Sequence, residues 1–208
     1  YYIDRRFPAK DVKLRTVADE NFTIYERSTD RIVGELDYVA ALLSLYEGAV
    51  YIHRSETHIV EELDVENQMA YIRKRDTGYY TQALEQKRVD VDEEIEARPW
   101  HAERLALGDV TVETRITGFK KVRFHSVENI GYGDVDLPSI LLETVALYLD
   151  VTEDLAKDAM RFGADFYHSG MHGVGHLVSS LMPFFVLCDP GDVDYFVDGR
   201  RLYVYDLY

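Results

Sequence analysis

Three histidines, one cysteine and two clusters of basic residues are the side chains whose types and spacing could support chemistry in this 208-residue chain. His168, His172 and His176 are separated by steps of four, which places three imidazoles on one face of a helix. Histidines four apart can chelate a metal, because that spacing brings two ring nitrogens within reach of one ion. A stand-alone metal-dependent enzyme or sensor is therefore one hypothesis for this chain.

The same histidines also have a purely structural interpretation, which we favour. The sequence HGVGH lacks the glutamate that follows the first histidine in the HExxH zinc motif, and no Asp or Glu lies between His168 and His176. Gly170, Gly173 and Gly175 indicate that another helix or strand packs closely here. In that case backbone carbonyls or carboxylates would satisfy the histidines. Both interpretations stay open at this point.

Cys188 is the only cysteine of the chain, which excludes an internal disulfide framework and a self-contained Cys-based zinc finger. It follows His176 by 12 residues, or about 18 Å along one continuous helix, so the two side chains cannot share an ion. A lone cysteine in an apolar turn is usually an inert core residue. We therefore expect no stoichiometric zinc in this chain by itself.

Two basic clusters are candidate contacts for DNA. They consist of Arg5, Arg6, Lys10, Lys13 and Arg15 near the N-terminus, and of Lys120, Lys121 and Arg123 further along. The net charge of −15 argues against strong independent nucleic-acid binding, because affinity for phosphates comes mainly from Lys and Arg. Each cluster could equally be an ordinary solvated face.

Motifs for catalysis are absent from the sequence. It contains no GxxxxGK[ST] phosphate loop, no Asp-Glu box for magnesium, no GxGxxG after a strand and no GxSxG elbow. The motifs alone indicate a binding or scaffolding module that needs no cofactor of its own. No uncharged apolar run of about 18 residues and no signal peptide is present, so we expect a cytoplasmic protein without a membrane partner.

The elements that must position these side chains are strands first and helices later. Alternating residues predict strands and hairpins up to about residue 133, including a hairpin around the turn RSET and a long hairpin from Tyr79 to Phe124. Asp37 is expected to cap a short helix, YVAALLSLY. After Gly133 the pattern predicts a helix over ILLETVALYLD and a second helix from Leu155 to Phe166, capped by Thr152 with Glu153 and Asp154. An apolar helix that begins near His168 follows and must be buried.

These elements predict an α+β fold. A mainly antiparallel sheet or small barrel with a long hairpin would be followed by a small helical bundle. The corresponding domains are a β-rich domain over residues 1–133 and a helical domain over residues 134–208. The chain begins at Tyr1 without a methionine and stops on the strand-like YVYDLY, so we expect it to be a piece of a longer protein.

The β-rich part resembles the region that follows the two motor domains in superfamily-2 DNA helicases of the YprA/MrfA type. The matching positions are Gly34, Asp37, Gly48, Ala49, Tyr51, His53, Val60, Leu63, Asp64, Tyr79, Tyr80 and Thr81. Ser55 departs from the pattern, because the family often has glycine there.

The resemblance continues to the end of the chain and covers most of residues 7–208. A "Asp-Leu-Pro … Glu-Thr-x-Ala" segment is matched by Asp136, Leu137, Pro138, Glu143, Thr144 and Ala146, and a "His-Gly-x-x-His … Pro … Cys-Asp" segment by His172, Gly173, His176, Pro183, Cys188, Asp189 and Asp192. Together these motifs are fairly specific, whereas any one alone would be weak.

The resemblance implies a parent protein that is an ATP-dependent DNA helicase active in DNA repair, using ATP, magnesium and zinc. It implies that this chain is an accessory region that guides single-stranded DNA or a duplex junction and contacts the motor domains of the same protein. It also implies that Cys188 is the first of four zinc ligands in a zinc-binding domain that only begins here. The other three cysteines are absent from this chain, which leaves Cys188 a ligand without its site.

Overall fold

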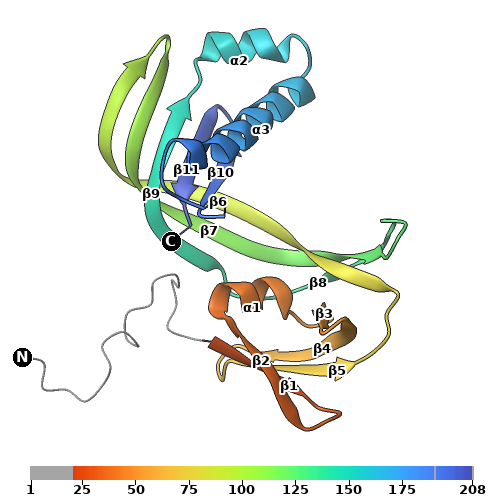
Figure 1. Cartoon of the computed structure of the whole chain (residues 1–208). Helices are drawn as coiled ribbons and strands as arrows, with labels where there is room; N and C mark the ends of the chain where they lie inside the picture. Colours follow the sequence, from red (N-terminus) through yellow and green to blue (C-terminus); the bar gives the residue numbers. More distant parts are fainter. Residues whose placement is uncertain (1–20, 190, 208) are drawn as a thin grey trace, which may run out of the picture. The chain divides into compact units, whose positions relative to one another are not determined.

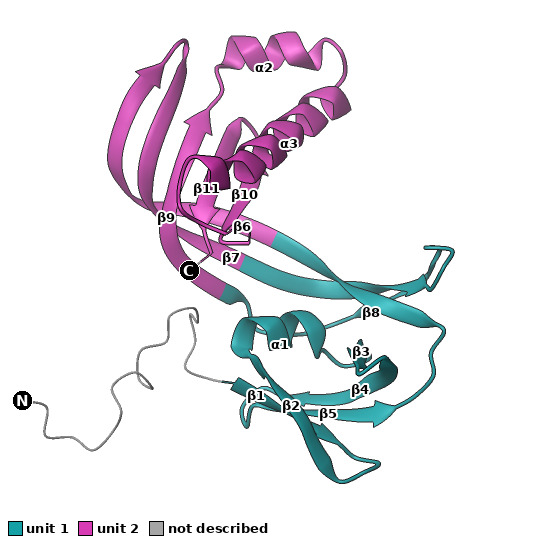
Figure 2. Ribbon diagram, in the orientation of Figure 1, with its two compact units in different colours: residues 1–86, 114–140 teal, residues 87–113, 141–208 magenta. Residues whose placement is uncertain are grey.

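The structure is a computed structural model that describes residues 21–189 and 191–207. It has an α+β fold dominated by antiparallel strands, as the sequence predicted (Figure 1). The chain divides into two compact units, which alternate along the sequence: unit 1 holds residues 1–86 and 114–140, and unit 2 holds residues 87–113 and 141–208 (Figure 2). The predicted domain boundary after residue 133 stays a prediction, because a packing unit need not be an independently folding domain.

Unit 1 is built on a five-stranded sheet with the order β2-β1-β5-β4-β3. Its strands are β1 (Asn21–Glu26), β2 (Arg31–Asp37), β3 (Val50–His53), β4 (Glu56–Asp64) and β5 (Met69–Lys74). Neighbouring strands are antiparallel except β1 and β5, which are parallel. The predicted RSET hairpin is confirmed. Arg54 and Ser55 form its turn with φ angles of 49° and 65°, which explains why glycine suits the position that Ser55 occupies.

Helix α1 (Tyr38–Ser44) follows β2 directly and confirms the predicted short helix. The carboxylate of Asp37 accepts a hydrogen bond of 2.9 Å from the backbone N–H of Ala40, which is the geometry of an N-cap. Apolar residues of and just after the helix, Ala41, Leu45 and Tyr46, are buried against Phe22, Ile24, Ile72 and Phe119. Helix α1 therefore closes the core of unit 1.

The second sheet has the order β10-β11-β9-β7-β6, with β8 also paired to β7. Its strands are β6 (Tyr79–Trp100), β7 (Glu103–Arg123), β8 (Asn129–Asp134), β9 (Ile140–Asp150), β10 (Val193–Asp198) and β11 (Arg201–Asp206). The long hairpin predicted from Tyr79 to Phe124 is confirmed as β6 and β7, each of which contributes residues to both units. The sequence also predicts an interruption of the first strand at Pro99 and Trp100, which is wrong, because β6 extends to Trp100.

One predicted helix is wrong, because ILLETVALYLD forms strand β9. Alternate residues of this segment face the interior: Ile140, Ala146 and Tyr148 are buried, whereas Leu141 and Val145 are exposed. The segment is apolar on both parities, so helical spacing and strand alternation both fit it. Pairing with β11, in which Tyr203 lies opposite Tyr148, decides the outcome.

Helices α2 (Glu153–Met160) and α3 (Ala164–Leu181) and a short 3-10 turn, η2 (Met182–Phe184), make up the helical part of unit 2. Thr152 caps α2 as predicted, accepting a hydrogen bond from the N–H of Leu155. The predicted second helix ends early, at Met160. Gly163 has a φ of 119° and permits the chain to turn into α3. The helical part is thus smaller than predicted and lies beside β10 and β11.

Helix α3 is not buried as the sequence predicted. Only Tyr167, Met171 and Gly175 are buried, on the side that packs against Leu202 and Val204 of β11 and Tyr195 of β10. Val178 and Met182 are partly buried against the same cluster. Most of the other apolar residues of this helix and of the turns after it are exposed: Phe166, Val174, Leu177, Leu181, Phe184, Phe185, Val186 and Leu187. Within the described residues, strands cover one side of α3 and leave the rest of its apolar stripe open.

Candidate nucleic-acid interface

The basic residues predicted on β7 lie in unit 1, where β7 pairs with β8. Lys120 lies opposite Tyr132, and a register shift follows between Lys121 and Val122. Residues directly opposite each other on paired strands point to the same face, so the Lys120 side chain shares a face with Tyr132, whose side chain is 68% exposed. A cation beside an exposed ring is the combination that binds single-stranded nucleic acid.

Lys121 points to other rings. Its Nζ lies 5.9 Å from the ring centroids of both Tyr79 and Phe119, within the range of cation–π contact. Arg123 is mostly exposed and forms an ion pair of 3.6 Å with Glu128, which is also mostly exposed. Surface pairs of this kind hold their partners weakly, so the Arg123 guanidinium remains available to a phosphate. The structure thus places these basic residues on a strand pair that also carries aromatic rings. Lys120 and Lys121, however, point to opposite faces of that pair.

The five N-terminal basic residues lie outside the described residues. Arg5, Arg6, Lys10, Lys13 and Arg15 therefore stay a prediction from the sequence.

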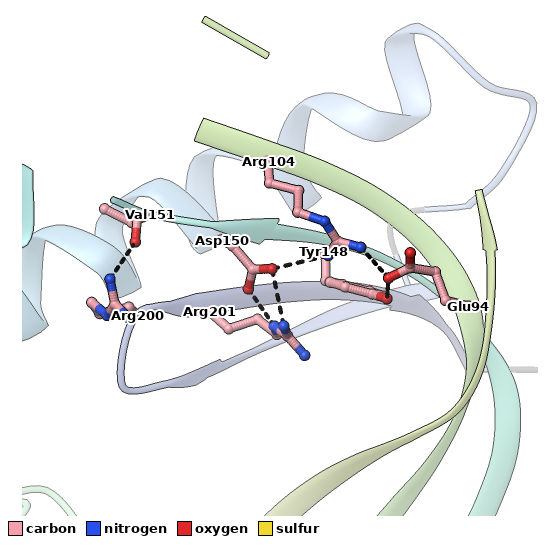
Figure 3. Close-up of polar contacts among 7 residues, drawn as sticks. All are labelled: Glu94, Arg104, Tyr148, Asp150, Val151, Arg200 and Arg201. Carbon is pink, nitrogen blue, oxygen red and sulfur yellow. Dashed lines mark hydrogen bonds and ion pairs between the residues drawn. The ribbon is translucent and has the colours of Figure 1, made fainter. Parts of the chain in front are cut away.

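Unit 2 holds a second charged cluster, which sequence reasoning missed (Figure 3). Asp150 on β9 is bound by two arginines: Arg201 donates two hydrogen bonds to it, one of them 2.9 Å long, and Arg104 donates another of 3.2 Å. Arg104 also pairs with Glu94, whose carboxylate accepts a hydrogen bond of 2.9 Å from the Tyr148 hydroxyl. These residues come from four different strands, and no sequence spacing brings them together.

Neighbouring charges and hydrogen bonds favour the ionised forms of the two carboxylates in this cluster. Burial by itself would raise the pKa of Asp150, but hydrogen bonds and charge from Arg201 and Arg104 hold it below its ordinary value. The hydrogen bond from Arg104 lowers the pKa of Glu94, and that from Tyr148 lowers it further. Burial and the bond to Glu94 raise the pKa of Tyr148. The Arg201 guanidinium lies 4.7 Å from the Tyr148 ring centroid, so it is held by ring and carboxylate together.

An open cavity of about 570 Å³ adjoins the cluster and is lined by Arg104, Asp150, Arg200 and Arg201 among others. Two of its three arginines are neutralised by Asp150 and Glu94. Within the described chain Arg200 has no carboxylate partner, since its guanidinium donates only to the Val151 carbonyl at 3.4 Å. Because most of its charges are paired with one another, we interpret this cluster as a structural link between strands of unit 2 and not as a binding site.

The three histidines of α3 are exposed and do not converge on one point. The rings of His172 and His176 contact Tyr195, with centroid distances of 6.1 and 5.7 Å, whereas His168 contacts its neighbour Tyr167. Close packing of a strand, as the glycines indicated, is found at Gly175, where a Cβ would lie 2.2 Å from the Tyr195 ring; Gly170 and Gly173 have nothing near them. The metal-site alternative on this helix stays a prediction.

Cys188 lies in a turn beyond η2 and is partly exposed. Burial raises the pKa of its thiol, and the charges of Asp192, Asp189 and Asp206 raise it further. Among residues 21–189 and 191–207, no three His, Cys, Asp or Glu side chains gather closely enough to hold a metal ion. The described residues thus do not fit a complete zinc site, and the role of Cys188 as a ligand stays a prediction.

No helix in the described part of the chain is long and apolar enough to cross a membrane.

Comparison of the sequence and comparison of the fold with known proteins lead to the same group of relatives. No protein-family model matches the chain. It is 32% identical over 199 residues to the uncharacterized ATP-dependent helicase YprA of Bacillus subtilis, which covers 93% of this chain and 26% of YprA. It is 23% identical over 194 residues to the ATP-dependent helicase hrq1 of Schizosaccharomyces pombe, covering 90% of this chain and 18% of that protein. The chain therefore spans about a quarter or less of the relatives it matches.

Solved structures extend this likeness to the fold. A crystal structure of the DUF1998 helicase MrfA bound to DNA matches with a TM-score of 0.71 and 29% identity, covering 100% of this chain and 29% of MrfA. A second, of MrfA bound to DNA and AMPPNP, matches with a TM-score of 0.65 over 100% of this chain and 27% of that one. Sequence and fold together show that the chain is homologous to a segment of the YprA/MrfA-type ATP-dependent helicases.

Proposed function

We propose that this chain is an accessory region of an ATP-dependent DNA helicase, and that it binds and positions a DNA strand without performing chemistry itself. The observation that carries the proposal is the match of the whole chain, in fold and in sequence, to part of a helicase whose crystal structure contains DNA. The resemblance in sequence extends the proposal to DNA repair and to contact with the motor domains of the same protein. ATP, magnesium and zinc would belong to that parent protein.

The β7–β8 surface of unit 1 supports this role. Lys120 and Arg123 offer charges to phosphates, and Tyr132 offers an exposed ring on which a base can stack. Because the chain carries a net charge of −15, such contacts must be local, and repulsion from the remaining surface keeps the affinity of the chain alone low. A guiding surface benefits from weak contacts, since a moving strand must be released.

The test is binding of a labelled single-stranded oligonucleotide to the 208-residue chain, measured by fluorescence anisotropy at several salt concentrations. Replacing Lys120, Lys121 and Arg123 by alanine should weaken binding and reduce the salt dependence, by a slope of about 0.7 for each lost phosphate contact. The matched control replaces Arg88, Arg98 and Arg115, which are exposed residues away from β8, and loses the same charge. Equal weakening in both variants would show that only net charge matters and would contradict this surface.

Catalysis offers a separate test of the accessory role. With no phosphate loop and no magnesium-binding acidic pair in the sequence, the chain should not hydrolyse ATP with or without DNA. Phosphate release above a protein-free control would contradict the proposal.

A further inference from the structure

A second group of basic residues lies in unit 1, around a pocket of about 330 Å³ between two turns of the five-stranded sheet. Arg31 begins β2, His53 ends β3, Arg54 lies in the β3–β4 turn and His58 lies on β4. These residues are separated by up to 27 positions in the sequence (58 − 31 = 27), so no local motif reveals them. The pocket is completed by Glu26, Thr29, Ile32, Val33 and Glu56.

The carboxylates of this pocket have partners, whereas its arginines do not. Glu26 accepts hydrogen bonds from the hydroxyls of Ser28 and Thr29, at 3.3 and 2.8 Å. Glu56 forms an ion pair with Lys74, and this pairing lowers its pKa. Within the described chain, neither Arg31 nor Arg54 makes an ion pair or a side-chain hydrogen bond, and both are exposed. Two guanidiniums without carboxylate partners are thus presented together in a chain that is otherwise strongly acidic.

His58 is a buried side chain that lines the pocket. Its side chain is 3% exposed, and its Nδ1 lies 3.2 Å from the Glu56 carbonyl oxygen. Because a carbonyl only accepts, Nδ1 carries a hydrogen. Its Nε2 lies 3.9 Å from the Glu26 carboxylate, which is longer than a hydrogen bond. Nε2 therefore lies near Glu26 without a hydrogen bond to it, and the ring serves as a lining residue of the pocket.

The backbone also holds Arg54 in place. Arg54 and Ser55 adopt positive φ angles in the two-residue turn between β3 and β4, a conformation that matches the twist of paired strands. On the other side of the pocket, Asp30 with a φ of 57° ends the β1–β2 turn just before Arg31. Two tight turns thus fix the positions from which the arginines project, which lowers the entropy lost when both bind one ligand.

We propose that this pocket binds a phosphodiester group of the DNA strand, with Arg31 and Arg54 as the binding residues and His53 and His58 lining the site. A guanidinium offers parallel N–H donors that match two phosphate oxygens, and this geometry favours a phosphate over a single halide ion. The exposed side chain of Ile32 at the rim suits the apolar faces of a sugar or base. The identification of DNA as the source of the phosphate rests on the proposed function; the affinity for phosphate does not.

The first experiment compares the double variant Arg31→Ala/Arg54→Ala with Arg88→Ala/Arg115→Ala, which removes the same charge outside the pocket. Single-stranded oligothymidylate should bind about tenfold more weakly to the first variant than to the second. The variant Arg31→Lys/Arg54→Lys should recover only part of the loss, because lysine keeps the charge but lacks the fork of donors. Both arginines are exposed, so these changes should leave the melting temperature unaltered.

A second experiment separates failure of the pocket from failure of the proposed function. Imidazole C–H signals of His53 and His58, assigned with His53→Gln and His58→Gln, are followed by NMR while inorganic phosphate is added to the 208-residue chain. Shifts that vanish in Arg31→Ala/Arg54→Ala support the pocket even if no DNA binds, in which case the proposed function fails alone. If DNA binds but neither the shifts nor the tenfold difference is seen, the pocket is overturned and the proposed function stands.

Discussion

Helices α1 and α3 both carry apolar side chains, but these side chains lie in different environments. In unit 1, Leu42 of α1 is 0% exposed and packs with Ile116 and Ile140. In unit 2, Leu177 of α3 is 59% exposed, although it lies on the same apolar helix as the buried Met171. The comparison teaches that apolar periodicity predicts a helix and the direction of one face, whereas burial depends on how many elements are available to cover that face.

Individual arginines also differ in whether a carboxylate holds them. In unit 2, Arg104 and Arg201 are neutralised by Asp150 and Glu94, so they connect strands. In unit 1, Arg31 and Arg54 have no such partners among the described residues. Arginine in an acidic protein is therefore structural where carboxylates converge on it and accessible to ligands where they do not.

The largest expected effect tests the contrast between the helices directly. Leu42→Ala should reduce the free energy of unfolding by about 2–5 kcal/mol, because it removes a fully buried side chain and leaves a cavity. The matched change Leu177→Ala should alter it by no more than about 0.5 kcal/mol, because that side chain is already in water. Urea unfolding measures both. A loss of similar size for Leu177→Ala would mean that the α3 stripe is covered in solution.

The second prediction concerns the contrast in arginine use. Asp150→Asn removes the carboxylate that two arginines share, and it should destabilise the chain by about 1–3 kcal/mol because part-buried guanidiniums lose their partner. The control Asp90→Asn breaks an exposed pair with Arg88 and should cost less than about 1 kcal/mol. Thermal unfolding measures the loss of stability in both variants. Equal losses would show that the unit 2 cluster is no stronger than a surface pair.

A third prediction compares the same substitution at two glycines of α3, where the change in stability should have opposite signs. Gly175→Ala should destabilise by about 1–2 kcal/mol, because the added Cβ would lie 2.2 Å from the Tyr195 ring. Gly170→Ala has nothing within 4 Å and should stabilise by about 0.5–1 kcal/mol through helix propensity. Melting temperatures should therefore move in opposite directions. If both variants gained stability, the packing of α3 on β10 would be looser than the structure shows.

The smallest expected effect is the acid sensitivity of unit 2. The pKa of Asp150 is held low by Arg201 and Arg104, and that of Asp194 by its bond from Lys87, each against the opposing effect of burial. A lowered pKa gives stability that is present above the ordinary value of about 4 and lost as the pH falls through the lowered one. As the pH falls below about 4, the wild-type chain should therefore lose more stability than Asp150→Asn/Asp194→Asn. Melting temperatures across this range measure the difference, and parallel curves would contradict it.

The sequence by itself determined the elements whose signals are local. Asp37 predicted the start of α1 and Thr152 that of α2, because a capping side chain bonds to a backbone N–H only a few residues away. The RSET turn and the alternating residues of β7 predicted their hairpins for the same reason. The family resemblance, which the comparisons with YprA and MrfA confirm, likewise needed only the order of residues.

Tertiary structure alone decided the rest. Residues 140–150 fit a helix as well as a strand, and only hydrogen bonding to neighbouring strands selects the strand. The exposure of Leu177 and the convergence of Arg31 with Arg54 depend on which elements lie nearby, and a sequence does not state this locally. The physical reason is that burial and charge pairing are sums over neighbours in space, whereas caps and turns are set by neighbours in the chain.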